Sequence, residues 1–327
     1  MRLFVLLPFV ASVLAASRTT APSGSIVVAK SGGDYDTISD AVAALSTSTT
    51  EEQIIYIEEG TYNEQVYIPP LEGKLYIYGQ TEDDTSYADN TVTITYDLSL
   101  ASVSTDDESA TLRNWSPKTQ VYNINVQNTY GKGHQALALS AYKTEQAYYG
   151  CNFTGWQDTV LAEAGYQFYG KSYIEGAIDF IFGQTSNAWF DGCTIGVADY
   201  DYGTITAQGR PSSSSDGYYV LNECTVEAAS GQDVGSGDYY LGRPWTEYAR
   251  VVFQKTKLSK VINSKGWVEW DTDEPNTEHV TFGEYDNSGT GASGTRASFA
   301  EELSSAVKIT TVLGSTYTDW VDTTYIS

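Results

Sequence analysis

The chain has 327 residues and carries 42 acidic against 18 basic side chains, for a formal net charge of −24. A net charge of this sign and size argues against nucleic acid or an anionic membrane as a partner. No Pro-, Ser- or charge-rich linker divides the chain, so residues 17–327 are predicted to form a single domain.

Residues 1–16 have the form of a secretory signal peptide. Arg2 is followed by an apolar stretch that is too short to span a bilayer, and small residues end the segment at Ala15 and Ala16. No later stretch of the sequence is apolar enough for a transmembrane helix. The sequence therefore predicts a secreted, extracellular chain with no membrane partner, and a monomer is the default expectation.

Short strands and one helix are predicted in the first part of the chain. Residues 25–30 alternate as a strand, and Thr37 with Asp40 has the capping-box spacing that begins a helix. Such a helix would cover the open edge at the start of a repeat fold. Further strands are predicted over residues 53–58, 64–68 and 74–79.

A short repeat follows from residue 124 onward. Pairs of apolar or small residues two positions apart recur at spacings of 27, 21, 21, 31 and 32 residues, as Ile124/Val126, Cys151/Phe153, Ser172/Ile174, Cys193/Ile195, Cys224/Val226 and Thr256/Leu258. Period-2 alternation identifies strands, and a strand in each repeat predicts an all-β parallel β-helix whose coils stack about 4.8 Å apart. One more strand is predicted over residues 266–270. A second capping box, from Ser298 to Glu301, predicts a short helix, so capping helices are expected near both ends.

The three cysteines, Cys151, Cys193 and Cys224, share one strand phase of this repeat. One interpretation is a ladder of buried thiols that act as small hydrophobes. The other is a disulfide, for which only Cys193 and Cys224 lie on adjacent coils, since two coils are about 10 Å apart and beyond bridging reach. Spacing alone leaves both open.

Asp158 and Asp179 are one 21-residue period apart, so the repeat places their Cα atoms on adjacent coils roughly 5 Å from each other. Two carboxylates at that distance repel by about 3 kcal/mol at an effective dielectric near 20. One carboxyl should therefore stay ionised while the other keeps its proton near neutral pH. An ionised carboxylate beside a protonated one is a nucleophile beside a general acid, although spacing does not assign the roles.

Two glutamines and an arginine are candidates to assist these acids. Gln135 lies 22 residues before Gln157, so both can flank the carboxyls, where an amide donates to a developing oxyanion without titrating. A ladder of amides that only satisfy one another is the alternative. In an enlarged loop, Arg243 can hold a carboxylate ionised and Trp245 can stack on a sugar, or both can be structural.

Several other chemistries find little support. His134 and His279 are the only histidines, and no Gly-x-Ser-x-Gly occurs, which argues against a Ser-His-Asp hydrolase. No His or Cys cluster accompanies the acids, so neither a metal nor another cofactor is expected. Asn114 and Asn152 begin Asn-x-Ser/Thr sequences and are candidate N-glycosylation sites.

Four segments in order resemble the signature segments of pectin methylesterases. They are GKGHQALAL at 131–139, GWQDT at 155–159, DFIFG at 179–183 and LGRPW at 241–245, and residues 28–38 also look like the family's N-terminal strand and helix. Departures are small: Ala177 and Ile178 stand where the family more often has Thr and Val, and Leu137 where Val is common. The acidic, secreted chain looks like microbial, in particular fungal, members.

The resemblance implies a right-handed parallel β-helix that hydrolyses the methyl esters of pectin (methyl-esterified homogalacturonan) in the plant cell wall to pectate and methanol. It implies Asp179 as nucleophile and Asp158 as general acid and then base. Gln135 and Gln157 would donate to the oxyanion, and Arg243 would orient Asp179. The residues that it places along the substrate groove are Trp156, Trp245, His134 and Phe180. From its charge, such an enzyme is expected to favour highly esterified pectin.

Two rival functions fit the same residues. Stacked acids about 5 Å apart on a β-helix also suit a polygalacturonase-type glycoside hydrolase. A non-catalytic carbohydrate-binding solenoid would use the same aromatic residues. A pectate lyase would need bound Ca²⁺, and no acidic cluster has the spacing of a Ca²⁺ loop.

Overall fold

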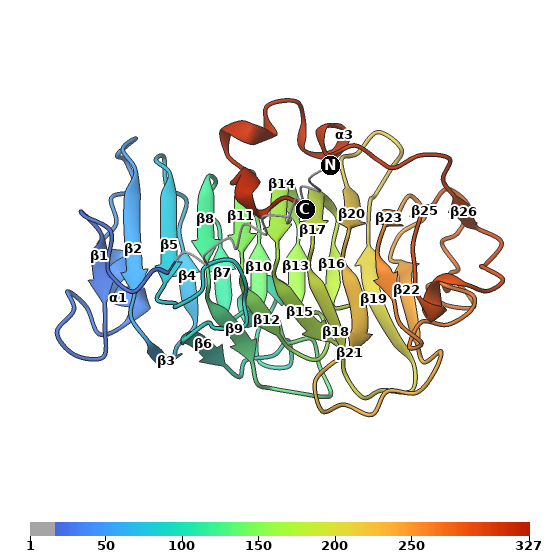
Figure 1. The fold of residues 1–327 in the computed structure, drawn as a ribbon, viewed down its shortest axis with the longest axis horizontal. Coiled ribbons are helices and arrows are strands. Elements are labelled where there is room, and N and C mark those ends of the chain that lie inside the picture. Colours follow the sequence, from blue (N-terminus) through green and yellow to red (C-terminus); the bar gives the residue numbers. More distant parts are fainter. Residues whose placement is uncertain (1–16) are drawn as a thin grey trace, which may run out of the picture.

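The computed structural model describes residues 17–327, so the predicted signal peptide over residues 1–16 lies outside the described part. Strands follow one another in chain order from one end of an elongated body to the other (Figure 1). They form three sheets in which every pair of neighbouring strands is parallel, which confirms the predicted all-β parallel β-helix. Within the described residues, no helix has the length and apolarity needed to cross a membrane.

Over residues 53–258, successive coils contribute strands to the three sheets in turn, whereas the strands before and after this range add only to the eleven-stranded sheet. The eleven-stranded sheet contains β1 (Ile26–Val28), β2 (Gln53–Ile57), β5 (Leu75–Gly79), β8 (Thr119–Tyr122), β11 (Gln146–Tyr149), β14 (Ala164–Gly170), β17 (Thr185–Asp191), β20 (Tyr218–Asn222), β23 (Arg250–Gln254), β25 (Thr281–Tyr285) and β26 (Ala300–Glu302). The eight-stranded sheet contains β3 (Gly60–Asn63), β6 (Val92–Tyr96), β9 (Asn125–Asn128), β12 (Asn152–Thr154), β15 (Tyr173–Gly176), β18 (Thr194–Val197), β21 (Thr225–Ala228) and β24 (Lys257–Leu258). The seven-stranded sheet contains β4 (Val66–Ile68), β7 (Leu112–Asn114), β10 (Leu139–Ala141), β13 (Val160–Ala162), β16 (Ile181–Gly183), β19 (Gly203–Gln208) and β22 (Tyr239–Pro244).

The predicted repeat is the register of the eight-stranded sheet. Its inward-facing row consists of Val126, Phe153, Ile174, Ile195, Val226 and Leu258, which are paired in that order and buried. Because the same position of each coil is apolar, one continuous core fills the solenoid. Rings stack along it at the strand spacing, with centroids of Tyr148 and Tyr169 5.1 Å apart and those of Tyr169 and Phe190 4.5 Å apart.

All three cysteines are free thiols buried in this core. The Sγ of Cys193 lies 3.2 Å from the carbonyl oxygen of Tyr169 one coil earlier. The structure therefore has the buried ladder of thiols rather than the disulfide between Cys193 and Cys224. Burial raises the pKa of the Cys151 thiol to about 12, so this group stays protonated and chemically quiet at neutral pH.

The N-terminal helix α1 (Ile38–Ala43) has the predicted place and cap. Thr37 Oγ1 accepts a hydrogen bond from the backbone N–H of Asp40 at 3.1 Å, and the Glu64 carboxylate accepts from the backbone N–H groups of Ile38 and Ser39. Ile38 and Val42 bury the apolar side of the helix, which packs on β1, β2 and β4. This helix covers the first coil of the solenoid (Figure 1).

Two predictions for the C-terminal part are wrong. Residues 298–301 do not begin a helix, because β26 (Ala300–Glu302) pairs with β25 and extends the sheet. The helix α3 (Ile309–Leu313) begins later and packs laterally on β14, β17 and β20, where Val312 and Leu313 are buried, so it does not close the end of the solenoid. Residues 266–270 form no strand, since Trp267 makes only an isolated bridge to Gly242. The side chain of Trp267 is buried against Phe282, on which it stacks.

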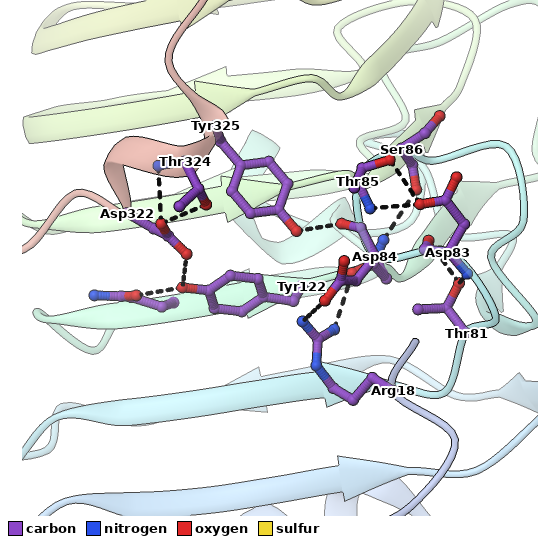
Figure 2. A network of polar contacts seen from close by, with 12 residues as sticks. Arg18, Thr81, Asp83, Asp84, Thr85, Ser86, Tyr122, Asp322, Thr324 and Tyr325 are labelled. Atoms are coloured by element: carbon purple, nitrogen blue, oxygen red, sulfur yellow. Dashed lines mark hydrogen bonds and ion pairs between the residues drawn. The ribbon is translucent and has the colours of Figure 1, made fainter. Parts of the chain in front are cut away.

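The two ends of the described chain meet on the eleven-stranded sheet (Figure 2). The Arg18 guanidinium donates to Asn123 Oδ1 at 2.9 Å, pairs with Asp84 at 3.4 Å and lies over the rings of Tyr78 and Tyr122. The C-terminal Tyr325 donates its hydroxyl to the carbonyl oxygen of Asp84. The N-terminal segment and the C-terminal tail are therefore linked through Asp84 on the outside of the eleven-stranded sheet.

Candidate active site

Asp158 and Asp179 lie side by side just before two neighbouring strands of the seven-stranded sheet. Val160 of β13 pairs with Ile181 of β16, so the residues two positions earlier are aligned, as the repeat predicted. Both aspartates have left-handed backbone angles, with φ of 62° and 49°. Asp is among the non-Gly residues that adopt this conformation most readily, and here it turns both carboxyls away from the core.

The five residues predicted to be catalytic line one cavity of about 260 Å³. They are Gln135, Gln157, Asp158, Asp179 and Arg243, and the wall is completed by Asp106, Phe182, Ala207, Trp245 and Trp270. The sequence positions span more than 100 residues, and the stacking of successive coils brings them together. Their roles in a reaction remain predictions.

Asp179 is held on both carboxylate oxygens by Arg243. The guanidinium donates from Nε to Oδ1 at 2.9 Å and from Nη2 to Oδ2 at 2.6 Å, which is the fork geometry of a strong ion pair. Arg243 is itself placed by a hydrogen bond from Nη1 to the backbone oxygen of Trp270 and by the Trp270 ring 4.3 Å away. The arginine therefore contacts the second stacked acid and not the first.

Unlike Asp179, Asp158 has no cation paired with its carboxyl group among the described residues. The residue is 8% exposed, and its carboxyl accepts no hydrogen bond from residues 17–327. Burial, followed by the charges of Asp179 and Asp106, raises the pKa of Asp158 well above its ordinary value, and Arg243 offsets this only in part. The geometry thus places a cation-paired carboxylate next to a carboxyl that favours its protonated form.

The side-chain amides of Gln135 and Gln157 face the cavity without partners among the described residues. Both side chains are partly exposed, and only their backbone groups take part in hydrogen bonds, for example from the N–H of Ala136 to the carbonyl oxygen of Gln157. The self-satisfied amide ladder is therefore absent from this part of the chain. Two amide donors are available for a substrate oxygen.

A second cavity of about 560 Å³ continues the first along the seven-stranded sheet. The two cavities share Asp106, Phe182 and Trp245. The outward residues of the sheet lie in one paired row, and all of them except Ser140 line one cavity or the other: Tyr67, Arg113, Ser140, Leu161, Phe182, Ala207 and Arg243. The result is a groove that crosses several strands of the seven-stranded sheet.

The helix α2 (Asp106–Ser109) forms a wall of this groove because Asp107 anchors it. The Asp107 carboxylate accepts from Arg113 Nε and Nη2 at 3.1 and 2.6 Å, from Trp115 Nε1 at 2.9 Å and from Ser140 Oγ at 2.7 Å. The neighbouring Asp106 turns into the groove instead, with a buried Oδ1 that has no partner among residues 17–327. Burial raises the pKa of Asp106.

The predicted groove residues have different positions. Trp245 lines both cavities. Trp156 is partly exposed and His134 exposed, and neither lines these cavities; Lys132 Nζ lies 4.2 Å from the Trp156 ring centre. For Phe180 the prediction is wrong, because its side chain is fully buried in the core. The left-handed turn at Asp179 directs the next side chain inward, and Phe182 is the phenylalanine in the groove.

The two candidate glycosylation sites also differ. Asn114 is fully buried on β7 and donates from Nδ2, the atom that would carry the glycan, to the hydroxyl of Tyr148 at 3.1 Å. The prediction for Asn114 is therefore wrong, because a glycan there would break the core. Asn152 is partly exposed on β12 and accepts at 2.9 Å from Thr154 Oγ1, and its glycosylation remains a prediction.

Sequence reasoning missed Thr204, Asp106, Phe182 and Glu163. Asp106 belongs to a helix outside the repeat, and Thr204 reaches Asp179 from the next coil across an enlarged loop, so no local motif indicates either of them. Phe182 could have been found by counting strand alternation from Ile181 rather than from Asp179. Among the described residues, Glu247, Glu278 and His279 are close enough to share a metal ion, but all three are exposed and none lines the cavity beside Asp158 and Asp179.

Comparison with known proteins agrees with this geometry. A family model described as pectinesterase matches residues 25–312. A pectinesterase from Aspergillus niger is 61% identical over 321 residues, covering 98% of this chain and 97% of the relative. A pectinesterase from Aspergillus aculeatus is 62% identical over 320 residues, covering 97% of each.

Solved structures support the same assignment. The pectin methylesterase from Aspergillus niger in deglycosylated form has a TM-score of 0.89 at 43% identity, covering 95% of this chain and 100% of that one. The pectin methylesterase from carrot has a TM-score of 0.78 at 29% identity, covering 89% and 91%. Fold, residues and relatives agree, and the chain belongs to the pectinesterase family of carboxylic ester hydrolases, with fungal relatives at high identity.

Proposed function

We propose that this chain hydrolyses the methyl esters of methyl-esterified homogalacturonan to pectate and methanol, with Asp179 as nucleophile and Asp158 as general acid and base. The observation that carries the proposal is the contrast between the two stacked carboxyls. Asp179 is ion-paired on both oxygens, whereas burial raises the pKa of Asp158. A carboxylate beside a neutral acid supplies the nucleophile and the general acid for acyl transfer.

In the first half of the proposed reaction, the Asp179 carboxylate attacks the carbonyl carbon of the ester and forms a new C–O bond. The amides of Gln135 and Gln157 donate hydrogen bonds to the oxyanion that develops. The bond to the methoxyl oxygen then breaks, and Asp158 gives its proton to that oxygen. Methanol leaves, and the galacturonyl group remains on Asp179 as an acid anhydride.

In the second half, the ionised Asp158 accepts a proton from water as the water oxygen attacks the galacturonyl carbon. The bond to Asp179 breaks and restores the carboxylate that Arg243 pairs with. The product is a galacturonic carboxylic acid, which ionises in solution. Asp158 is protonated again, so the site returns to its starting state.

The substrate is proposed to be the pectin of plant cell walls, bound along the groove on the seven-stranded sheet. Trp245 is positioned between the two cavities, where its ring can stack on a sugar. Trp156 and His134 are proposed to contact the polymer where it leaves the catalytic cavity. The enzyme is proposed to be secreted and monomeric.

Two acids without a cationic partner in residues 17–327 support the preference for esterified substrate. Glu163 lines the larger cavity, accepts from the N–H of Gln184 at 3.2 Å, and has a pKa raised to about 7 by burial. The charge of Asp106 contributes to this shift. Arg113, the basic residue that lines the same cavity, is paired with Asp107. A sugar bound here meets carboxyl groups, so a neutral methyl ester is accepted better than a free carboxylate.

Glu163→Gln should weaken this discrimination. We expect the ratio of kcat/KM on highly esterified to that on sparsely esterified pectin to rise in the wild type as pH rises through about 7, because Glu163 loses its proton there. The variant should show a smaller rise, by about 2- to 5-fold at low salt, which is the size of a partly screened charge pair. Initial methanol release at pH 5.5 and 8, with uncatalysed blanks, measures the ratios. A wild-type ratio that falls with pH would contradict the proposal.

Methanol release from highly esterified pectin tests the function itself, with viscosity and absorbance at 235 nm followed in the same samples. Methanol with constant viscosity and no new ultraviolet absorbance is the expected result for an esterase. Falling viscosity without methanol would instead mean that the stacked acids cut glycosidic bonds, as in a polygalacturonase. No change in any signal, with polymer binding retained, would indicate a carbohydrate-binding solenoid.

A further inference from the structure

Thr204 occupies the position that follows the two aspartates on the next coil. Ile181 of β16 pairs with Thr206 of β19, so Asp179 and Thr204, two positions earlier, are aligned in the same way as Asp158 and Asp179. The stack therefore continues from two acids to a hydroxyl. Thr204 is 2% exposed, and its N–H donates to the carbonyl oxygen of Ala177 at 3.1 Å, which fixes it in the sheet.

The Thr204 hydroxyl connects two groups of Asp179. Its Oγ1 lies 2.6 Å from Asp179 Oδ1 and 3.0 Å from the Asp179 backbone nitrogen. A hydroxyl has one proton to donate and lone pairs that accept. The proton therefore goes to the carboxylate, while the oxygen accepts from the N–H, so one side chain fixes both the left-handed backbone of Asp179 and the orientation of its carboxylate.

The two carboxylate oxygens consequently differ. Oδ1 accepts from Thr204 Oγ1 and from Arg243 Nε, which occupies both of its in-plane lone pairs. Among residues 17–327, Oδ2 accepts only from Arg243 Nη2. A lone pair remains free on Oδ2 alone, and an oxygen with fewer donors keeps more of the negative charge with which to attack a carbonyl carbon.

We propose that Thr204 is a positioning residue that anchors Oδ1 of Asp179 and thereby makes Oδ2 the attacking oxygen. This inference rests on the proposed role of Asp179 as nucleophile. Oδ2 forms the bond to the ester carbonyl carbon, the bond to the methoxyl oxygen breaks with the proton supplied by Asp158, and Oδ1 remains bound to Thr204 and Arg243 throughout. Thr204 is suited to this task because its β-branched side chain is restricted at χ1, is buried, and is held by hydrogen bonds to both groups of Asp179, so the acid is oriented before substrate binds.

Thr204→Val removes the hydroxyl at nearly constant volume. We expect kcat on highly esterified pectin to fall about 10- to 100-fold, the range for losing one hydrogen bond to a charged group, while KM changes less than about threefold. Thr204→Ser keeps the hydroxyl and should retain kcat within about fivefold of the wild type. A structural role alone would not separate kcat from KM and would not be rescued by Ser.

Thr206→Val is the matched control. Thr206 lies two residues further along β19, is fully buried, and donates from Oγ1 to the carbonyl oxygen of Leu241 at 2.9 Å, away from both acids. The same substitution there removes one buried hydrogen bond and should lower the melting temperature without a comparable loss of kcat. If Thr204→Val does not fold by near-ultraviolet circular dichroism, Thr204→Ala supplies the same comparison.

Equal kcat in the Thr204→Val and Thr206→Val variants would overturn the proposal, and so would a Ser variant as slow as the Val variant. Asp179→Asn is assayed beside them to separate the two levels of inference. An active Asp179→Asn enzyme would contradict the proposed nucleophile itself. An inactive one, together with a fully active Thr204→Val enzyme, would contradict only the role of Thr204.

Discussion

Asp179→Asn is expected to reduce kcat on methyl-esterified pectin by on the order of 10⁴-fold or more, because an amide is a poor nucleophile and cannot form the anhydride. The substitution keeps the size of the side chain. It also keeps a side-chain oxygen that can accept from Arg243 Nε and Thr204 Oγ1, both of which donate to Oδ1 of Asp179 in the wild type. Methanol release by purified protein, with wild-type enzyme diluted to the detection limit as a standard, measures the residual activity.

The same substitution leaves Arg243 facing an uncharged side chain, so stability has to be measured in parallel. The guanidinium is partly buried, and loss of its counter-ion should lower the melting temperature. Binding of pectin should persist, because the groove residues Tyr67, Trp115 and Trp245 are unchanged. A variant that binds and folds yet retains more than about a hundredth of the wild-type kcat would rule out Asp179 as the nucleophile.

Asp158→Asn should lower kcat by about 10²- to 10⁴-fold, which is the usual contribution of a general acid or base. It should also remove the alkaline limb of the pH profile. Burial, followed by the charge of Asp179, raises the pKa of Asp158, and the first step needs the protonated form. Activity of the wild type therefore falls as pH rises through this raised pKa, whereas Asn has no proton to lose.

An activated ester separates the two halves of this role. A leaving group that departs without a proton, such as a p-nitrophenolate in a galacturonate aryl ester, bypasses the general acid in the first half of the reaction. The Asp158→Asn variant should therefore release one equivalent of that group rapidly and then stall at hydrolysis of the acyl group. If the variant keeps the wild-type alkaline limb, the titrating group is another residue.

Strand alternation and spacing were enough to predict the architecture. Val126, Phe153 and Ile174 occupy the same position in successive coils, because every coil must present an apolar side chain to the same core. The apolar residues therefore repeat at regular spacings in the sequence. The same regularity placed Asp158 beside Asp179, since residues one period apart stack. The cap before Ile38 was also readable, because capping is a contact between near neighbours in the chain.

The wrong predictions have one physical cause, which is that a local pattern does not say what lies across from it. The capping box at Ser298 is overridden because β25 offers an open edge that β26 completes. Asn114 has the form of a glycosylation site, yet the strand that contains it directs its side chain toward Tyr148 in the core. Phe180 belongs to a motif that the resemblance places along the groove, yet it directly follows the outward-facing Asp179, and its side chain packs in the core.

By itself, the sequence determined the stacked acids, the oxyanion candidates and the family. These depend on residue identity and on a repeat in which the spacing between two residues gives the number of coils that separate them. Only the tertiary structure decided which acid is paired with Arg243 by contact, which is buried without a donor, and that Thr204 and Asp106 belong to the same cavity. Loop lengths between coils vary, so the distance of a side chain from the acids depends on where each loop rejoins the sheet. This distance is set by packing between segments that are far apart in the sequence, so it cannot be predicted from any single stretch of the chain.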